Sequence, residues 1–302
     1  MPDSVTKINM FAFNGCTSLE KIVIPSSVTS IEQDTFNNCT ALKSVEMSNS
    51  IKNINREAFA YCTSLETIVI PDSVTTIDTF AFSGCTSLKS VKLPSSVTTI
   101  GGGVFNNCGF ESIGPEGSGC DFEIPSSMTT IYNSMFTNCA ELKSVELPDS
   151  ITTIGKEAFK NCTSLKSIKL PNSITSLNDS VFSGCTSIKS IGPEGSGCDF
   201  EIPSSMINIG RYTFTNCTAL ESIEIPDSIT YIGETVFYNC TALKSITFNS
   251  PSIRFSSSTF NECRAIKSII YKNTKTKWNS MTKNMKFNSR FTVHCTDGDI
   301  SY

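Results

Sequence analysis

The sequence contains few of the residues on which enzyme chemistry most often depends. It has one histidine and one tryptophan among 302 residues. A single histidine argues against a histidine-based catalytic triad and against a metal site built from several histidines. No phosphate-binding Gly-Lys-Ser/Thr motif and no zinc-spaced cysteine cluster occurs. We therefore predict no catalytic residues, no metal ligands and no cofactor, and expect that the protein is not an enzyme. A glycan-processing enzyme is the least favoured alternative, because the scattered acidic residues single out no catalytic pair.

Long apolar runs are also absent. No stretch approaches the ~20 residues needed to cross a membrane, and the first ten residues lack the basic and apolar regions of a signal peptide. The net charge of −4 argues against general nucleic-acid binding. Residues 264–290 nevertheless carry eight basic and no acidic side chains. We interpret this segment as a solvated basic end, with a site for an acidic partner as the alternative.

Eleven of the fourteen cysteines follow a fixed period. Within three runs, successive members are 23 residues apart: Cys16, Cys39, Cys62, Cys85 and Cys108, then Cys139, Cys162 and Cys185, then Cys217, Cys240 and Cys263. A constant period of this length is typical of stacked structural repeats.

Each repeat has the same internal pattern when positions are counted from its cysteine. Leu or Ile stands at +3, aliphatic residues at +6 and +8, Pro at +9, Val or Ile at +12, Ile at +15 and Phe at +20. The alternation around +6 to +8 predicts a short strand that proline ends, and the β-branched stretch from +12 to +15 predicts a second. The segment after it fits a single 3-10 or α turn. Asn or Gly at +22 predicts a left-handed corner.

One such unit cannot bury its own apolar side, whereas a stack of units can. We therefore predict a β-rich solenoid of about twelve parallel rungs, roughly 55–60 Å long at the usual strand spacing. The phenylalanines at +20 and the aliphatic positions would form buried columns. We expect the repeat cysteines to form a ladder of buried free thiols, because parallel side chains in a column are poorly aimed for disulfides.

Two rungs carry an identical insertion. The segment from Ile113 to Pro125 recurs from Ile191 to Pro203, which adds nine residues near 114–122 and 192–200. Glycine and proline predict a loop, after which Phe122 and Phe200 would resume the strand. Cys120 and Cys198 would lie in these loops as incidental exposed cysteines.

The two ends of the chain differ from the repeat. The chain begins within a rung and has no cap, so we expect a further segment, which could include a signal region, before Met1. At the other end, residues 275–286 are helix-permissive around Trp278, residues 291–295 predict a strand, and Asp297-Gly298 predicts a turn. We therefore divide the chain into a solenoid, residues 1–271, and a C-terminal cap, residues 272–302, in which Trp278 covers the last rung.

The repeat resembles a known family. The unit C-T-S-L-x-S-I-x-L-P-x-S-V-T-x-I-x-x-x-x-F-x-x-C, seen in residues 85–108 and 162–185, is similar to the repeat of BspA-like leucine-rich-repeat surface proteins. The Gly-Pro-Glu-Gly-Ser-Gly insertion and the end of the chain from Trp278 to Ile300 are also similar to features of that family in gut bacteria. The resemblance implies a leucine-rich-repeat solenoid in surface or secreted proteins that adhere to host proteins and cells. It brings no catalytic residues. Ser48 and Asn249 depart from it by replacing the +9 proline, and Ile253 and Phe255 suggest a second strand shifted by one residue.

The outward positions of the first strand, +5 and +7, are where a partner could bind. The +5 column is nearly all serine, whereas the +7 column varies and can encode recognition without harm to the stack. We predict a ligand-binding face at the +7 residues Val23, Glu46, Val69, Lys92, Glu146, Lys169 and Glu224. A solvated face without a function is the alternative for this column.

The function that these features favour is an adhesion or protein-binding module at the cell surface or in a secreted protein. The expected partner is a host matrix or cell-surface protein, and we expect a monomer. A structural spacer that presents another domain and an intracellular scaffold, which free thiols would suit, are the alternatives.

Overall fold

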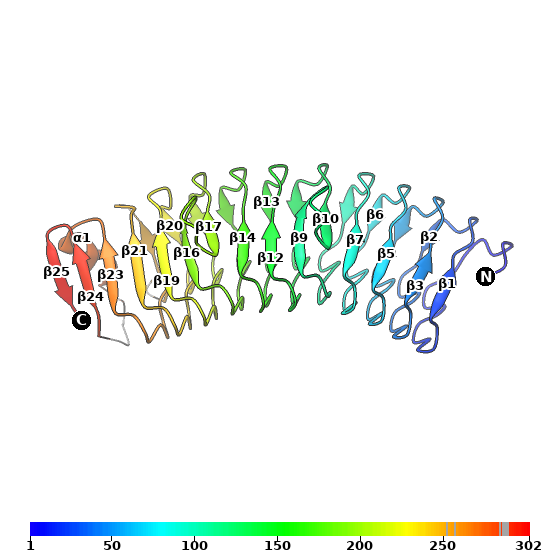
Figure 1. Cartoon of the computed structure of the whole chain (residues 1–302), viewed down its shortest axis with the longest axis horizontal. Coiled ribbons are helices and arrows are strands. Elements are labelled where there is room, and N and C mark those ends of the chain that lie inside the picture. Colours follow the sequence, from blue (N-terminus) through cyan, green and yellow to red (C-terminus); the bar gives the residue numbers. More distant parts are fainter. Residues whose placement is uncertain (252, 257, 284, 286–289) are drawn as a thin grey trace.

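The protein is an arched rod of stacked coils in the computed structural model (Figure 1). The structure describes residues 1–251, 253–256, 258–283, 285 and 290–302. Lys286, at the end of the predicted helix-permissive segment and within the basic end, lies outside the described residues. Nearly all regular structure in the described residues is strand, and most coils contribute a strand to one long, mainly parallel sheet, as the repeat pattern predicts.

The main side of the rod is built from the predicted first strands, from one further strand in each insertion and from the two C-terminal strands. Their bounds are β1 (Lys21–Val23), β3 (Ser44–Glu46), β5 (Thr67–Val69), β7 (Ser90–Lys92), β9 (Ser112–Pro115), β10 (Phe122–Ile124), β12 (Ser144–Glu146), β14 (Ser167–Lys169), β16 (Ser190–Pro193), β17 (Phe200–Ile202), β19 (Ser222–Ile225), β21 (Ser245–Phe248), β23 (Ser268–Tyr271), β24 (Thr292–Cys295) and β25 (Gly298–Ser301). The strands β1 and β3 form one parallel pair, and β5 to β25 form a thirteen-stranded sheet. Residues one repeat apart are direct neighbours, as Ile22 and Val45 illustrate.

A second side carries shorter strands. They are β2 (Ser30–Ile31), β4 (Asn53–Ile54), β6 (Thr76–Ile77), β8 (Thr99–Ile100), β11 (Thr130–Ile131), β13 (Thr153–Ile154), β15 (Ser176–Leu177), β18 (Asn208–Ile209), β20 (Tyr231–Ile232) and β22 (Arg254–Phe255). Each covers only +14 and +15 of the predicted stretch, although the side chain at +12, such as Val28, is also buried. The expectation that the second strand is shifted by one residue at Ile253 and Phe255 is wrong, because Phe255 in β22 pairs in register with Ile232 in β20.

The third side consists of hydrogen-bonded turns that form no continuous helix. Alternate N–H groups bond within the rung to the carbonyl three residues earlier, as from Cys39 to Phe36, the hydrogen-bond pattern of a 3-10 turn. The N–H groups between them bond to the next rung, as from Phe36 to Ala58. This alternation requires two left-handed residues in each rung. One is the predicted corner directly before the cysteine, such as Asn38 at φ 60°. The other lies five residues before the same cysteine, such as Asp34 at φ 53°.

The core is a set of parallel columns. The +20 phenylalanine rings stack from Phe13 to Phe260, and neighbouring rings such as Phe59 and Phe82 lie 5.4 Å apart and 2° from parallel. All fourteen cysteines are free, and the ten repeat cysteines from Cys39 to Cys263 are buried. The predicted ladder of buried thiols is therefore confirmed.

Each insertion adds a strand, so the expectation that Phe122 and Phe200 would resume the interrupted strand is wrong. Phe122 lies in β10, a separate strand that pairs in parallel with β9 on one side and β7 on the other. The chain makes a tight coil with only residues 116–121 between the two strands. The reason is packing: Phe122 enters the buried column next to Val91 and contacts the ring of Phe105 at 5.1 Å. The second insertion does the same through β17.

The C-terminal elements cover the last coil (Figure 1). Helix α1 (Lys275–Thr282) begins after Thr274, whose side chain accepts a hydrogen bond from the N–H of Lys277. Trp278 is fully buried against the rings of Phe248, Phe255 and Tyr271. The predicted strand β24 continues the parallel sheet and forms an antiparallel hairpin with β25. The turn between them lies at Thr296 and Asp297, one residue before the predicted place, because Gly298 already pairs with Cys295. The position of the domain boundary at residue 271 stays a prediction.

Candidate ligand-binding face

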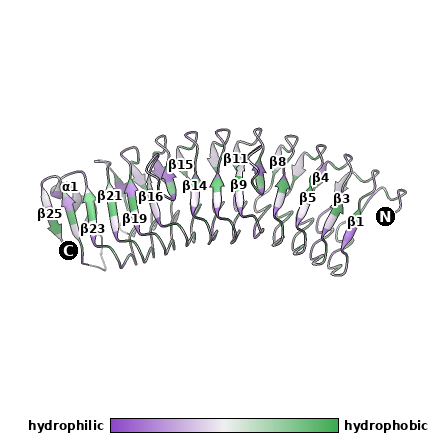
Figure 2. Ribbon diagram, viewed as in Figure 1, coloured by the Kyte–Doolittle hydropathy of each residue, from purple (hydrophilic) through white to green (hydrophobic). Residues whose placement is uncertain are grey.

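The outward side of the main sheet is exposed in the way that the alternation predicts. In the three-residue strands that begin at +5, the middle residue is buried and the residue after it is exposed, as in β5, where Ile68 is 5% exposed and Val69 is 78% exposed. All seven predicted +7 residues are exposed. Figure 2 shows hydrophobic and hydrophilic residues interspersed along these strands.

The sheet register brings the charged members of this column next to each other. Glu146 is the direct neighbour of Lys169, whose Nζ lies 2.7 Å from Glu146 Oε1. This hydrogen bond and the negative charge of Glu146 raise the pKa of Lys169. Because both side chains are largely exposed, the pair contributes little to folding and is available to a partner.

Two acidic residues of the column were missed by the sequence analysis. Glu123 lies in the inserted β10 directly beside Lys92, and Glu201 lies in the inserted β17 directly beside Lys169. The sequence did contain a signal for strand β10, because apolar Phe122 and Ile124 alternate with Glu123. The insertion was nevertheless interpreted as a loop up to Phe122. Each lysine therefore has an acidic neighbour that the repeat alone does not supply.

The two new carboxylates are held in place by the loops that precede them. Glu123 Oε1 accepts a hydrogen bond of 3.0 Å from the N–H of Gly119, and Glu201 Oε1 accepts one of 2.8 Å from the N–H of Gly197. Hydrogen bonds from the N–H groups of Gly117 and Gly119 lower the pKa of Glu123. The insertions thus place two oriented negative charges on an otherwise regular face.

Ion pairs between successive rungs line one edge of the face at position +4. They join Lys43 to Glu20 at 3.0 Å, Lys143 to Glu111 at 2.5 Å and Lys244 to Glu221 at 2.5 Å. Hydrogen bonds from these lysines, followed by their charge, lower the pKa values of the three glutamates. These three pairs are neutral, but the same edge also carries Lys89, Lys166, Lys189 and Lys267 against Glu66, so it is positively charged beside the more acidic +7 column.

Two shallow hollows lie on the same face. One, of about 340 Å³, is lined by Thr67, Val69, Asp72, Ser90, Lys92 and Pro94, among others. The other, of about 320 Å³, is lined by Pro115, Glu146, Pro148, Asp149, Lys169 and Pro171, among others. Each contains side chains of the predicted column and prolines that follow the strands. They could accept single side chains of a partner.

Among the described residues, no group of three or more His, Cys, Asp or Glu side chains is placed to hold a metal ion. The lone histidine, His294, lies 3.0 Å from Asp299 on the exposed terminal hairpin. No helix within the described ranges is long and apolar enough to cross a bilayer.

Solved structures share this architecture. A leucine-rich cell surface protein from Faecalibacterium prausnitzii is 29% identical, with a TM-score of 0.56 over 94% of this chain and 68% of that chain. A leucine-rich repeat protein from Bacteroides ovatus is 26% identical, with a TM-score of 0.54 over 97% of this chain and 91% of that one. The pneumococcal vaccine antigen PcpA, 19% identical with a TM-score of 0.53 over 90% of this chain and 78% of its own, shares the fold.

The family of the chain follows from its repeats. No curated protein matches the chain. The profile of a family described as BspA type leucine rich repeat region matches in six copies, over residues 1–114, 118–196 and 196–293. These ranges include nearly every coil described above. The chain therefore belongs to the family of proteins with a BspA-type leucine-rich repeat region.

Proposed function

We propose that the chain is a non-catalytic protein-binding module of a cell-surface or secreted protein. In this proposal it acts as a monomer and binds a host matrix or cell-surface protein through the +7 column. The single observation that carries the proposal is an exposed +7 column that varies from rung to rung beside a +5 column that is nearly all serine. The description of the Faecalibacterium relative as a cell surface protein supports the location.

The size of the face suits a protein partner. A stable protein interface buries about 800 Å² on each side, which needs a broad surface and not a single deep cavity. The main sheet offers exposed +7 residues on successive strands from Val23 to Ile270. Such a surface can contact an extended partner over many rungs.

The charge pattern supplies a basis for specificity. Lys92 and Lys169 alternate with Glu123, Glu146 and Glu201 along the rod. A partner with the complementary sequence of charges would be favoured, and one with like charges at these places would be repelled. The exposed Val23 and Val69 at one end and Ile270 at the other add apolar anchors.

A solid-phase screen against host matrix proteins, followed by charge reversal, tests the proposal. The variant Lys92→Glu, Lys169→Glu and Glu224→Lys should abolish binding of any partner found, with little change in melting temperature because exposed charges contribute little to stability. The matched control is Lys52→Glu, Lys156→Glu and Glu234→Lys, which makes the same net charge change at exposed positions outside the column. Binding that survives the first variant would exclude this face, and no binding across the panel would favour the spacer.

A further inference from the structure

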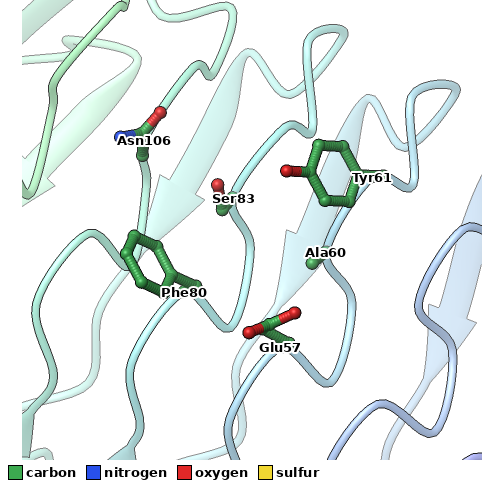
Figure 3. Close-up of a pocket in the computed structure, with 6 residues that line it drawn as sticks. All are labelled: Glu57, Ala60, Tyr61, Phe80, Ser83 and Asn106. Carbon is green, nitrogen blue, oxygen red and sulfur yellow. The ribbon is translucent and has the colours of Figure 1, made fainter.

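A pocket on the turn side of the rod is distinct from the main-sheet face. It has a volume of about 260 Å³ and is lined by Glu57, Ala60, Tyr61, Phe80, Ser83 and Asn106 (Figure 3). These residues come from three successive rungs. We call it the corner pocket. Two of its lining residues are aromatic and have a left-handed backbone.

Tyr61 and Phe80 both have left-handed backbones, at φ 59° for each. This conformation is sterically unfavourable for bulky residues, whereas Asn and Gly adopt it readily. In the corner column of Tyr61, nine of the eleven left-handed residues are Asn or Gly: Gly15, Asn38, Gly84, Asn107, Asn138, Asn161, Gly184, Asn216 and Asn239. A tyrosine at this place is therefore a local departure that the stack does not require.

The next rung makes room for both rings. The ring of Tyr61 lies over Gly84, where a Cβ atom would come within 2.6 Å of Tyr61 Cδ1. The ring of Phe80 lies over Gly103 in the same way. Each aromatic side chain is thus paired with a glycine one repeat later. Two half-exposed rings are fixed on the wall of one pocket.

Polar groups with spare hydrogen-bonding capacity complete the wall. Within the described part of the chain, the Ser83 hydroxyl, the Asn106 amide and the Tyr61 hydroxyl make no side-chain hydrogen bond. Ser83 is only 9% exposed, so its hydroxyl faces little solvent besides the pocket. Together these groups can both donate and accept hydrogen bonds.

The charge of the pocket favours a neutral ligand. Glu57 is the acidic group, and its Oε1 already accepts a hydrogen bond of 3.0 Å from Arg56 Nε and lies 2.9 Å from Arg56 Nη2. Its Oε2 lies 3.3 Å from Asn37 Nδ2. A cation would have to compete with Arg56, whereas a hydroxyl group can use the remaining lone pairs of the carboxylate.

We propose that the corner pocket binds one neutral sugar residue of a glycan. A pyranose ring presents an apolar C–H face that can pack on Tyr61 and hydroxyl groups that can bond to Glu57, Ser83 and Asn106. The volume is sufficient for one such ring. The proposal rests on the corner pocket alone and does not depend on the protein partner of the main-sheet face.

Saturation-transfer NMR of the whole chain with glucose, galactose, mannose and N-acetylglucosamine tests this proposal. We expect at least one of them to bind with a Kd of roughly 1–10 mM, as suits a small ligand in a shallow site. The variant Tyr61→Asn installs the usual residue of the column and should fold normally, with binding about tenfold weaker or lost. Phe80→Ser should weaken it similarly.

The matched control is Tyr212→Ser, which removes another exposed, left-handed tyrosine away from the pocket and should leave binding unchanged. Circular dichroism checks that each variant is folded. Binding that persists in both Tyr61→Asn and Phe80→Ser would overturn the proposal. So would no transfer from any of the four sugars, or binding of tetramethylammonium chloride alone, which would identify a cation site.

Discussion

Cys62 and Phe36 are joined across neighbouring rungs by a hydrogen bond, in which the Cys62 thiol donates to the Phe36 carbonyl over 3.2 Å. The same bond recurs along the rod, from Cys39 with Phe13 to Cys263 with Phe237. Each thiol therefore fills a small buried space and adds a second hydrogen bond to a carbonyl that already accepts one from the turn, as Phe36 does from the N–H of Cys39. A disulfide between two rungs would remove both donors.

The first prediction concerns thiol reactivity. Cys16, Cys120, Cys198 and Cys295 are partly exposed, and the ten other cysteines are buried. Titration of the native protein with Ellman's reagent should therefore give no more than four fast-reacting thiols, and all fourteen should react after unfolding in guanidinium. Fast reaction of ten or more thiols in the native protein would contradict the buried ladder.

The second prediction is a loss of stability at alkaline pH. Burial raises the pKa of Cys85 to about 12, and the pKa values of Cys139 and Cys217 rise to about 12 for the same reason. Above pH ~9 the unfolded chain releases thiol protons that the folded chain keeps, so the free energy of unfolding falls as the pH rises toward 12. Each such thiol should contribute a loss of about 1 kcal/mol between pH 9 and pH 10.

Urea unfolding of the wild type and of Cys85→Ala at pH 8 and pH 10 measures this effect. The variant should be less stable at pH 8 because it loses buried volume, yet its further loss at pH 10 should be smaller by about 1–2 kcal/mol. Cys120→Ala, at a partly exposed position in the inserted loop, is the control. An equal pH dependence in Cys85→Ala and the wild type would show that the thiol does not stay protonated in the fold.

Much of the fold can be predicted from the spacing of residues in the sequence. The alternation around Ile68 and Val69 predicts which side chain is buried, and the identical 23-residue offsets predict that Phe59 and Phe82 stack. The exposure of the +7 column follows from the same alternation. These features depend on side-chain periodicity, which a sequence displays directly.

Other features depend on contacts between rungs. Glu57 adopts φ 54° although glutamate does not favour left-handed backbone, because its N–H bonds to the Thr79 carbonyl of the next rung. The extra strand that holds Glu123 likewise exists because Phe122 finds space in a neighbouring column. The sequence pattern within one repeat contains neither relationship, and so the acidic neighbours of Lys92 and Lys169 were missed.

The third prediction tests the phenylalanine column. Phe159 stacks between Phe136 and Phe182 at 5.6 and 5.5 Å and is fully buried. Phe159→Ala should lower the free energy of unfolding by about 3–5 kcal/mol through the cavity that it leaves. Phe13→Ala, at the partly buried end of the column with one stacked neighbour, should cost about 1–2 kcal/mol. Equal losses in urea unfolding would contradict a column whose members are stabilised by neighbours on both sides.

The fourth prediction concerns the C-terminal end, which the only tryptophan reports. Trp278 is fully buried, and its indole N–H donates a hydrogen bond of 3.0 Å to the Tyr302 hydroxyl. Tyr302→Phe removes this acceptor, so the local free energy of unfolding at the C-terminal end should fall by about 1 kcal/mol. The fluorescence transition of Trp278 should therefore occur at a lower urea concentration. Circular dichroism of the whole rod should change less, because each coil of a solenoid contacts only its neighbours. Tyr231→Phe, whose side chain is as exposed as that of Tyr302 but lies farther along the stack, should leave both transitions in place. An unchanged Trp278 transition in Tyr302→Phe would mean that the terminal hydroxyl does not hold the cap on the last coil.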